Sequence, residues 1–210
     1  MIMQQLSATE NQISPLILPM GGEFSAYLRD ESRISGQAES ISFPRCEAQI
    51  CAILQAMSAA GMRVTAQGGR TGLAAGCVPA GGHILNLSRM QGLLRLRGEQ
   101  GRFYLSVQPG LSLLALNKLL AEKRLASPYF DAESQRAAQA LAQAPAQFFA
   151  PDPTETGATL GGMAACNASG ARSFRYGSMR RHVRALRVAL IDGDMLALKR
   201  GQCRAQGRRL

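Results

Sequence analysis

The chain has 210 residues, of which 46% are hydrophobic, and this is enough for one domain with a buried core. Tryptophan is absent and only 5% of the residues are aromatic, which argues against the stacking platforms that bind nucleic-acid bases. No apolar run reaches the roughly 18 residues of a membrane span, and the N-terminus lacks the basic and apolar regions of a secretory signal.

The net charge of +10 is concentrated at the C-terminal end. Residues 170–210 contain eleven Lys or Arg but only two acids, so this segment carries +9 of the total. Three interpretations stay open for it: contact with nucleic acid, contact with an anionic cofactor, or a solvated face.

The cysteines and histidines argue against a metal site. The five cysteines are odd in number and their spacings match no zinc pattern, so we expect reduced thiols in a cytoplasmic protein. The only histidines, His83 and His182, are too few for a histidine-rich metal centre. We expect both to be structural rather than catalytic bases.

Several helices and strands are predicted in chain order. Residues 1–41 are weakly periodic and are interpreted as an N-terminal extension to a domain over residues 42–210, with a polar loop at 28–36. A helix is predicted next, since Ile50, Ile53, Leu54 and Met57 share one face and Gly61 is placed to end it. Strands are expected within residues 62–67, 81–90 and 102–110.

The second half of the chain predicts two more helices and a hairpin. Ser112 is a plausible N-cap for a helix that carries Leu113, Leu116 and Leu120 on one side. The Ala/Gln-rich residues 131–147 are also expected to be helical, as an insertion rather than as core. Two apolar runs around Asp192-Gly193 predict a hairpin with a two-residue turn.

Two glycine-rich stretches interrupt this pattern: "GGRTGLAAG" at residues 68–76 and "PDPTETGATLGGMAACNASGARSFRYG" at 151–177. Neither has the spacing of a P-loop or of a Rossmann turn. Successive backbone N–H groups in such loops can instead form a concave nest for an anion, and glycine lets the ligand approach closely. The alternative is that each loop is only a tight connection.

The order of these segments, including "GMRVTAQGGRTGLAAG", "VQPG", "PDPTETGATLGGMAACNASGARSFRYG" and "ALIDGD", closely resembles the FAD-binding domain of the vanillyl-alcohol oxidase/p-cresol methylhydroxylase family. Within that family, the chain is most similar to the branch of the glycolate oxidase FAD subunit and D-lactate dehydrogenase. The resemblance covers residues 43–198. It implies an α+β fold of two small α/β subdomains with the cofactor between them.

The resemblance also implies which residues bind FAD. The first loop would wrap the pyrophosphate through Gly68, Gly69, Arg70, Thr71, Gly72 and Leu73. The second loop would run along the cofactor through Thr156, Gly157, Ala158, Thr159, Gly161, Gly162, Asn167 and Gly170. Asn167 is expected to brace the loop, whereas Arg172 and Tyr176 either face the flavin or fix the strand that follows.

Three features of the chain depart from the family pattern. Many relatives attach flavin through a histidine in the first loop; this chain has Arg70 there, so noncovalent FAD is expected. Residues 127–150 are longer than the usual link and are interpreted as a surface excursion. Relatives continue with further flavin-domain strands and a substrate cap. The histidines and acids of that cap bind metal and take the substrate proton. The resemblance therefore implies that the C-terminal part and the cap are missing here.

The leading hypothesis is that the chain is the FAD-binding portion of a D-2-hydroxy acid dehydrogenase, which passes hydride from a small-molecule substrate to flavin N5. The expected partner is a second chain that supplies the cap, or an iron–sulfur subunit. No residue is assigned a catalytic role, and Cys166 and Ser169 are interpreted as loop packing. The alternative is an inactive remnant or an assembly partner of a split enzyme. Nucleic-acid binding through the arginine-rich end is the least favoured hypothesis.

Overall fold

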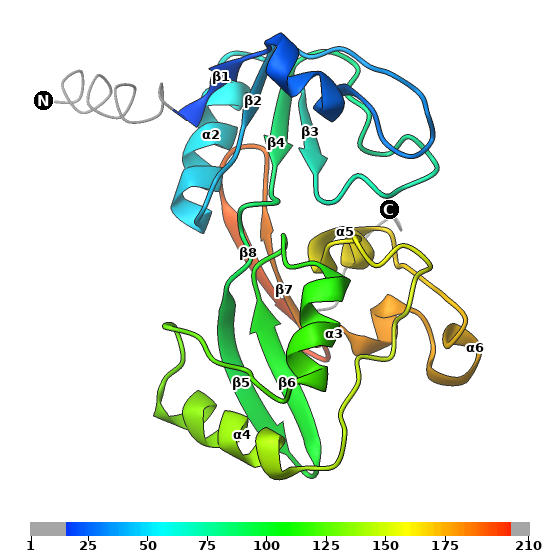
Figure 1. The fold of residues 1–210 in the computed structure, drawn as a ribbon. Coiled ribbons are helices and arrows are strands. Elements are labelled where there is room, and N and C mark those ends of the chain that lie inside the picture. Colours follow the sequence, from blue (N-terminus) through cyan, green and yellow to red (C-terminus); the bar gives the residue numbers. More distant parts are fainter. Residues whose placement is uncertain (1–15, 203–210) are drawn as a thin grey trace, which may run out of the picture.

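The computed structural model describes residues 16–202 and shows two lobes joined by a hairpin (Figure 1). One lobe is a small sheet with a helix beside it, and the other packs helices on a pair of strands. This confirms the expected mixed α/β fold of two subdomains. Residues 1–15 of the predicted extension, together with Cys203 and the last three arginines at 204, 208 and 209, lie outside the described residues.

The N-terminal lobe is a four-stranded sheet in the order β1-β2-β4-β3. Its strands are β1 (Leu18–Pro19), β2 (Ser40–Ser42), β3 (Val64–Gln67) and β4 (His83–Asn86). The inner strand β4 runs parallel to both β2 and β3, while β1 pairs antiparallel with β2. The carboxyl ends of β2, β3 and β4 therefore meet at one edge of the sheet, which is where the first glycine loop begins.

Helix α2 (Glu47–Ala59) confirms the predicted apolar face. Its buried residues Ile50, Ile53, Leu54 and Met57 form one core cluster with Leu85 and Met90. Gly61 follows the helix with φ of +62°, a left-handed conformation that favours glycine and ends the helix.

Part of the segment that precedes residue 42 also belongs to this lobe. The 3₁₀ helix η2 (Gly22–Leu28) and strand β1 place apolar side chains, including Leu18, Phe24 and Tyr27, against the buried Ile41 and Ile84. Of the predicted polar loop at 28–36, Leu28 ends η2 and residues 29–36 form a loop with a bridge between Arg29 and Ser35. The domain boundary at residue 42 stays a prediction, but the residues from 16 onward are packed against the sheet.

The second lobe is built on the antiparallel strands β5 (Leu93–Glu99) and β6 (Arg102–Val107). Helices α3 (Leu113–Ala121), α4 (Ala132–Gln143) and α5 (Leu160–Ala165) surround them. Strand β6 and helix α3 were predicted, and the Ser112 hydroxyl caps α3 by accepting from the backbone N–H of Ala115 at 3.2 Å. Strand β5 was not predicted, although Leu93 and Leu96 are buried in the core of this lobe.

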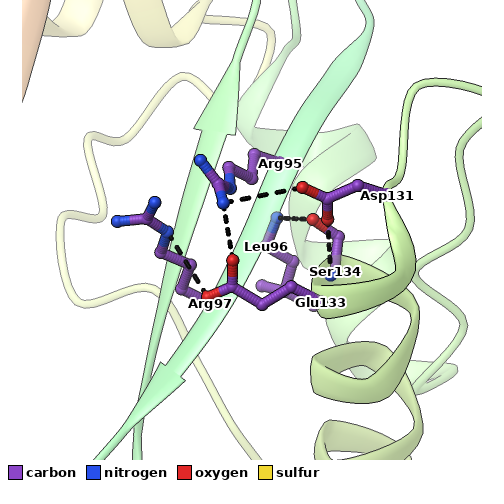
Figure 2. A network of polar contacts seen from close by, with 6 residues as sticks. All are labelled: Arg95, Leu96, Arg97, Asp131, Glu133 and Ser134. Carbon is purple, nitrogen blue, oxygen red and sulfur yellow. Dashed lines mark hydrogen bonds and ion pairs between the residues drawn. The ribbon is translucent and has the colours of Figure 1, made fainter.

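Helix α4 corrects the interpretation of residues 131–147 as an insertion outside the core. Ala137 and Leu141 are buried in the main cluster of the second lobe, and Leu141 is only 1% exposed. Figure 2 shows the start of α4 against β5, where the buried Ser134 hydroxyl accepts from the backbone N–H of Leu96 at 3.1 Å. The helix is therefore a structural layer of this lobe, and residues 127–150 are not a surface excursion as a whole.

The predicted hairpin is formed by β7 (Ala185–Ala189) and β8 (Met195–Lys199), after two short helices, α6 (Ser173–Tyr176) and η3 (Met179–His182). The backbone N–H of Leu190 donates to the Asp194 carbonyl at 2.8 Å, so the turn consists of residues 191–193. It is therefore one residue longer than the predicted two-residue turn. Gly193 takes a φ of +87° there, and a Cβ would lie 2.8 Å from the Cys51 carbonyl of α2.

The hairpin links the two lobes. In the middle of β7, Arg187 Nε pairs with Glu47 of α2 at 2.7 Å, and just before β7 Arg184 donates to the Tyr104 hydroxyl of β6 at 3.1 Å. Figure 1 shows β7 and β8 lying between the sheet of the first lobe and the strands of the second. Across residues 16–202, no helix combines the length and apolar character needed to cross a membrane.

Candidate cofactor site

The fold brings the two glycine-rich loops into direct contact. A side chain at Gly68 would collide with the hydroxyl oxygen of Thr159, and a Cβ at Gly69 would lie only 2.5 Å from the Gly157 carbonyl oxygen. Only glycine permits this approach, since real Cβ atoms do not come so close to an oxygen. The two stretches that the sequence predicted to share a site therefore meet at the junction of the lobes.

The backbone of the first loop has the character of an anion nest. Arg70 and Ala75 both have φ of +57°, a left-handed conformation that is strained for residues with a side chain. Among the residues that the structure describes, the N–H groups of residues 68–73 donate to no protein acceptor. A run of free donors next to left-handed backbone is the arrangement that holds a phosphate.

Gln67 anchors this loop, and the sequence analysis did not identify it. Its side chain is only 2% exposed, and Nε2 donates to the carbonyls of Tyr27 at 2.7 Å and Cys77 at 2.8 Å. The Gln67 Oε1 accepts from Asn86 at 3.3 Å. One buried amide thus joins both ends of the loop to β4 and to the N-terminal segment. In the sequence, Gln67 is a single polar residue at the end of a predicted strand, and this pattern does not indicate that its side chain anchors the loop.

Arg70 was expected to add positive charge to the loop. Its guanidinium lies over the Tyr27 ring, 4.4 Å from the ring centroid, and donates to the carbonyl of Ala26. The side chain therefore also ties the loop to η2. Of the remaining residues, Thr71 lies beside Gly157 and Leu73 is 79% exposed.

The second loop is fixed against the start of α3. Backbone N–H groups of Leu113 and Leu114 donate to the carbonyls of Ala158 and Thr156, both at 2.9 Å. Thr159 caps α5, with its hydroxyl accepting from the N–H of Gly162 at 3.4 Å. The loop that meets Gly68 and Gly69 is thus held rigidly by the second lobe.

Several predicted site residues already make protein contacts. Gly161 packs on Pro109, where a Cβ would lie 2.5 Å from the proline Cβ, and Gly170 packs on the backbone of Asp152. The N–H groups of Gly157 and Ala158 are directed to Glu155, at 2.9 and 3.2 Å. These residues shape the loop by their conformation and packing.

Asn167 braces the end of the second loop, as the sequence analysis expected. Its φ is +47°, and its side-chain oxygen accepts from the Ser178 hydroxyl and from the backbone N–H of Arg180, both at 2.9 Å. The residue thereby joins α5 to η3. Arg172 immediately precedes α6 and Tyr176 is the last residue of α6, and both line a hollow together with Phe148 and Arg175.

Neither histidine is placed as a catalytic base. His83 is fully buried, and its two ring nitrogens bond to the hydroxyls of Ser40 and Ser42 at 2.8 Å each. Burial lowers the pKa of His83 to about 4, so the neutral ring is the stable form. His182 bonds to the Tyr176 carbonyl at 3.2 Å and packs against Phe149. Both histidines support the surrounding structure.

The thiols and acids do not form a reactive cluster. Burial, together with the nearby carboxylate of Asp30, raises the pKa of Cys77 to about 11, which makes this thiol a poor nucleophile. Cys166 is exposed and, like the other described cysteines, is a free thiol. In the part of the chain that the structure covers, no three of His, Cys, Asp or Glu gather at a metal-binding distance.

A loop with a run of free backbone donors lies against a second loop at the junction of the two lobes, and such backbone can hold an anionic group such as a phosphate. The particular cofactor follows from the family, since the FAD binding domain family matches residues 38–144 and 133–199. The chain belongs to this family of FAD binding domains, as the sequence resemblance predicted.

Two relatives illustrate the similarity. The chain is 30% identical over 191 residues to a D-lactate dehydrogenase of Anaerostipes hadrus, covering 89% of this chain and 35% of the relative. It is 29% identical over 161 residues to a D-2-hydroxyglutarate dehydrogenase of Xanthomonas citri pv. viticola, covering 76% of this chain and 29% of the relative. The chain therefore spans about a third of the length of these dehydrogenases.

Solved structures support the fold. The glucooligosaccharide oxidase of Acremonium strictum, described with a 6-S-cysteinyl, 8α-N1-histidyl FAD, has a TM-score of 0.63 at 18% identity. The match covers 86% of this chain and 33% of the oxidase. The shared architecture is that of the FAD-binding part of the oxidase fold, and it carries no information on substrate.

Proposed function

We propose that this chain forms the FAD-binding part of a flavin-dependent dehydrogenase that oxidises a D-2-hydroxy acid. The observation that carries the proposal is the contact of the two glycine loops beside the free N–H groups of residues 68–73. The named activities of the dehydrogenase relatives supply the substrate class. FAD, when bound, accepts the hydride that leaves the α-carbon of the hydroxy acid.

In this proposal the chain's own residues bind and orient the cofactor. Backbone N–H groups of Gly68, Gly69, Arg70, Thr71, Gly72 and Leu73, which have no backbone acceptor in the protein, would donate to the pyrophosphate. Thr156 is exposed and offers its hydroxyl from the opposite loop, while the buried Thr159 caps α5 and packs on Gly68. Gly157, Ala158, Gly161, Gly162, Asn167 and Gly170 give that loop its shape, since their groups are already engaged by the protein.

We propose noncovalent attachment of FAD. The first loop has no histidine, and the buried His83 cannot reach a cofactor because both ring nitrogens bond within the sheet. Acid precipitation of the flavin-loaded protein should release all yellow colour into the supernatant. Colour that stays in the pellet would contradict noncovalent attachment.

No described residue is placed to take the proton from the substrate hydroxyl. We therefore propose that the base and the remaining contacts to substrate come from additional polypeptide, either on the same protein or on a second chain. The competing possibility is an inactive remnant or an assembly partner that binds flavin weakly. The cytoplasmic location expected from the cysteines stays a prediction.

The test is the visible absorbance spectrum of the purified chain after addition of FAD and desalting. Flavin bands should survive desalting if the two loops form a competent cradle. A chain that is folded by circular dichroism but retains no flavin would overturn the proposal. Anaerobic addition of D-lactate or D-2-hydroxyglutarate should leave the flavin oxidised in the chain alone, and bleaching would show that the base lies within this chain.

A further inference from the structure

A hollow on the second lobe lies outside the glycine loops. It has a volume of about 390 Å³ and is lined by Phe148, Arg172, Arg175 and Tyr176. Helix α6 carries two of these residues and ends in Tyr176, while Phe148 comes from the segment after α4. Figure 1 shows α6 at the periphery of the molecule, beyond α5.

The walls of the hollow alternate between guanidinium groups and aromatic rings. The Arg172 guanidinium lies 5.4 Å from the centroid of Phe148, and that of Arg175 lies 5.4 Å from the centroid of Tyr176. The two rings meet edge to face at 5.5 Å. A guanidinium that lies over an aromatic face keeps its N–H donors free, because these N–H bonds point outward in the plane of the guanidinium itself.

The charge of the hollow is positive. Two of its four lining residues are arginines and none is acidic, while Asp152 lies beside it, with its carboxylate 3.4 Å from Nε of Arg172 and also accepting from the Arg172 backbone N–H. Arg175 forms no ion pair with any residue between 16 and 202. Asp152 therefore orients one guanidinium and leaves the second cation uncompensated.

Aromatic surface is exposed around the hollow. Phe148 is 56% exposed, and Phe174 of α6 is fully exposed. Aromatic rings next to donor groups favour a ligand that has both a flat apolar part and an anionic part. The bidentate fork of arginine matches a carboxylate or a phosphate in geometry.

We propose that this hollow is a binding site for a small organic oxyanion, in which the guanidinium groups of Arg172 and Arg175 hold a carboxylate or phosphate and the rings of Phe148 and Tyr176 cover its flat remainder. None of the four lining residues is among those proposed to bind the cofactor. The site does not depend on the proposed dehydrogenase function.

Titration calorimetry tests this with probes that differ in one property each. Benzoate and phenyl phosphate have a ring and an oxyanion, acetate lacks the ring, and benzamide lacks the charge. We expect benzoate or phenyl phosphate to bind more tightly than acetate and benzamide, by about tenfold. The tighter of the two identifies a carboxylate or a phosphate as the natural anion. Equal binding of benzoate and benzamide, or no heat from either anion, would overturn the proposal.

Variants locate the binding. Arg175→Gln should weaken the aromatic anion by about tenfold, and Phe148→Leu should weaken it while acetate is unaffected. Arg102→Gln is the matched control. Arg102 is an exposed residue of β6 outside the hollow, and its substitution removes the same positive charge. An equal loss in Arg102→Gln would show a general charge effect and contradict the site. Competition by excess FAD would also contradict it, because the hollow would then belong to the cofactor site.

Discussion

Gly69 is the residue at which the cofactor site depends most directly on the absence of a side chain. Gly69→Ala would place a methyl group 2.5 Å from the Gly157 carbonyl oxygen and push the two loops apart. We expect this change to weaken FAD binding by at least about tenfold, which is 1.4 kcal/mol. FAD retention after desalting, or calorimetric titration with FAD, measures the effect.

Gly76→Ala is the matched control in the same loop. A Cβ at Gly76 meets nothing within 4 Å, and its φ is not left-handed, so alanine should fit without strain. FAD affinity should therefore be unchanged in this variant. Equal losses in the two variants would show that the loop tolerates no substitution for reasons unrelated to the contact with Gly157.

His83 makes the stability of the sheet depend on pH. Its pKa is about 4 in the folded chain and 6.5 ordinarily, so the unfolded chain binds the proton more readily. The contribution of neutral His83 is complete above pH 6.5 and is lost progressively as the pH falls toward 4. From pH 7.5 to 5 the free energy of unfolding should fall by about 2 kcal/mol on this account.

Urea denaturation at pH 7.5 and pH 5 measures this dependence. His83→Gln keeps a neutral amide between Ser40 and Ser42 but removes the titrating group. The variant should be less dependent on pH over this interval, even if its stability at pH 7.5 is lower. If the wild type and the variant lose the same free energy between the two pH values, His83 is not the responsible group.

At the scale of elements, α4 is held by two kinds of contact that differ in strength (Figure 2). The buried hydroxyl of Ser134 satisfies the Leu96 N–H, whereas Glu133 pairs with Arg95 at 2.5 Å on a partly exposed surface. Ser134→Ala should lower the free energy of unfolding by about 1–3 kcal/mol, because a buried donor loses its acceptor. Glu133→Gln should cost less than about 1 kcal/mol.

The two variants are compared by chemical denaturation at neutral pH. High salt should reduce the effect of Glu133→Gln further, since exposed ion pairs are screened, and leave that of Ser134→Ala unchanged. A larger loss in Glu133→Gln than in Ser134→Ala would mean that the surface ion pairs, not the buried hydrogen bond, fix the helix.

The sequence predicted elements with strong periodicity and misjudged those with small buried residues. Helix α2 places four large apolar residues on one face, and that pattern was sufficient. Helix α4 buries only Ser134, Ala137 and Leu141. Because two of these side chains are small or polar, the sequence pattern did not indicate a face that packs in the core. Strand β5 was missed because only part of its "LLRLRGE" sequence is buried, and its outer half is charged.

In the candidate site, too, local sequence pattern predicted some features and missed others. The glycine spacing identified both loops, since few other residues permit a close approach between two backbones. The contact of Gly68 with Thr159 joins residues far apart in the chain and depends on how the lobes pack, which no local pattern encodes. The role of Gln67, and the use of Gly161 to approach Pro109, likewise depend on tertiary contacts.

At the scale of the whole molecule, the lobes have separate cores, and the described contacts between them are few. The clusters around Ile53 and Ile41 lie in the first lobe and the cluster around Leu96 lies in the second, with the β7–β8 hairpin and the glycine loops between them. A cofactor held by both loops would stabilise both lobes at once, because binding to the folded form alone raises the free energy of unfolding.

Hydrogen exchange with and without excess FAD tests this coupling. We expect slower exchange both in β3 and β4 and in β5, α3 and α5, since each loop is anchored in a different lobe. Gly69→Ala should reduce the added protection in both lobes together, by about tenfold at the same FAD concentration, whereas Gly76→Ala should retain it. Protection limited to the first lobe would mean that the N–H groups of residues 68–73 hold the cofactor without the second loop, and that the two lobes are coupled by the hairpin alone.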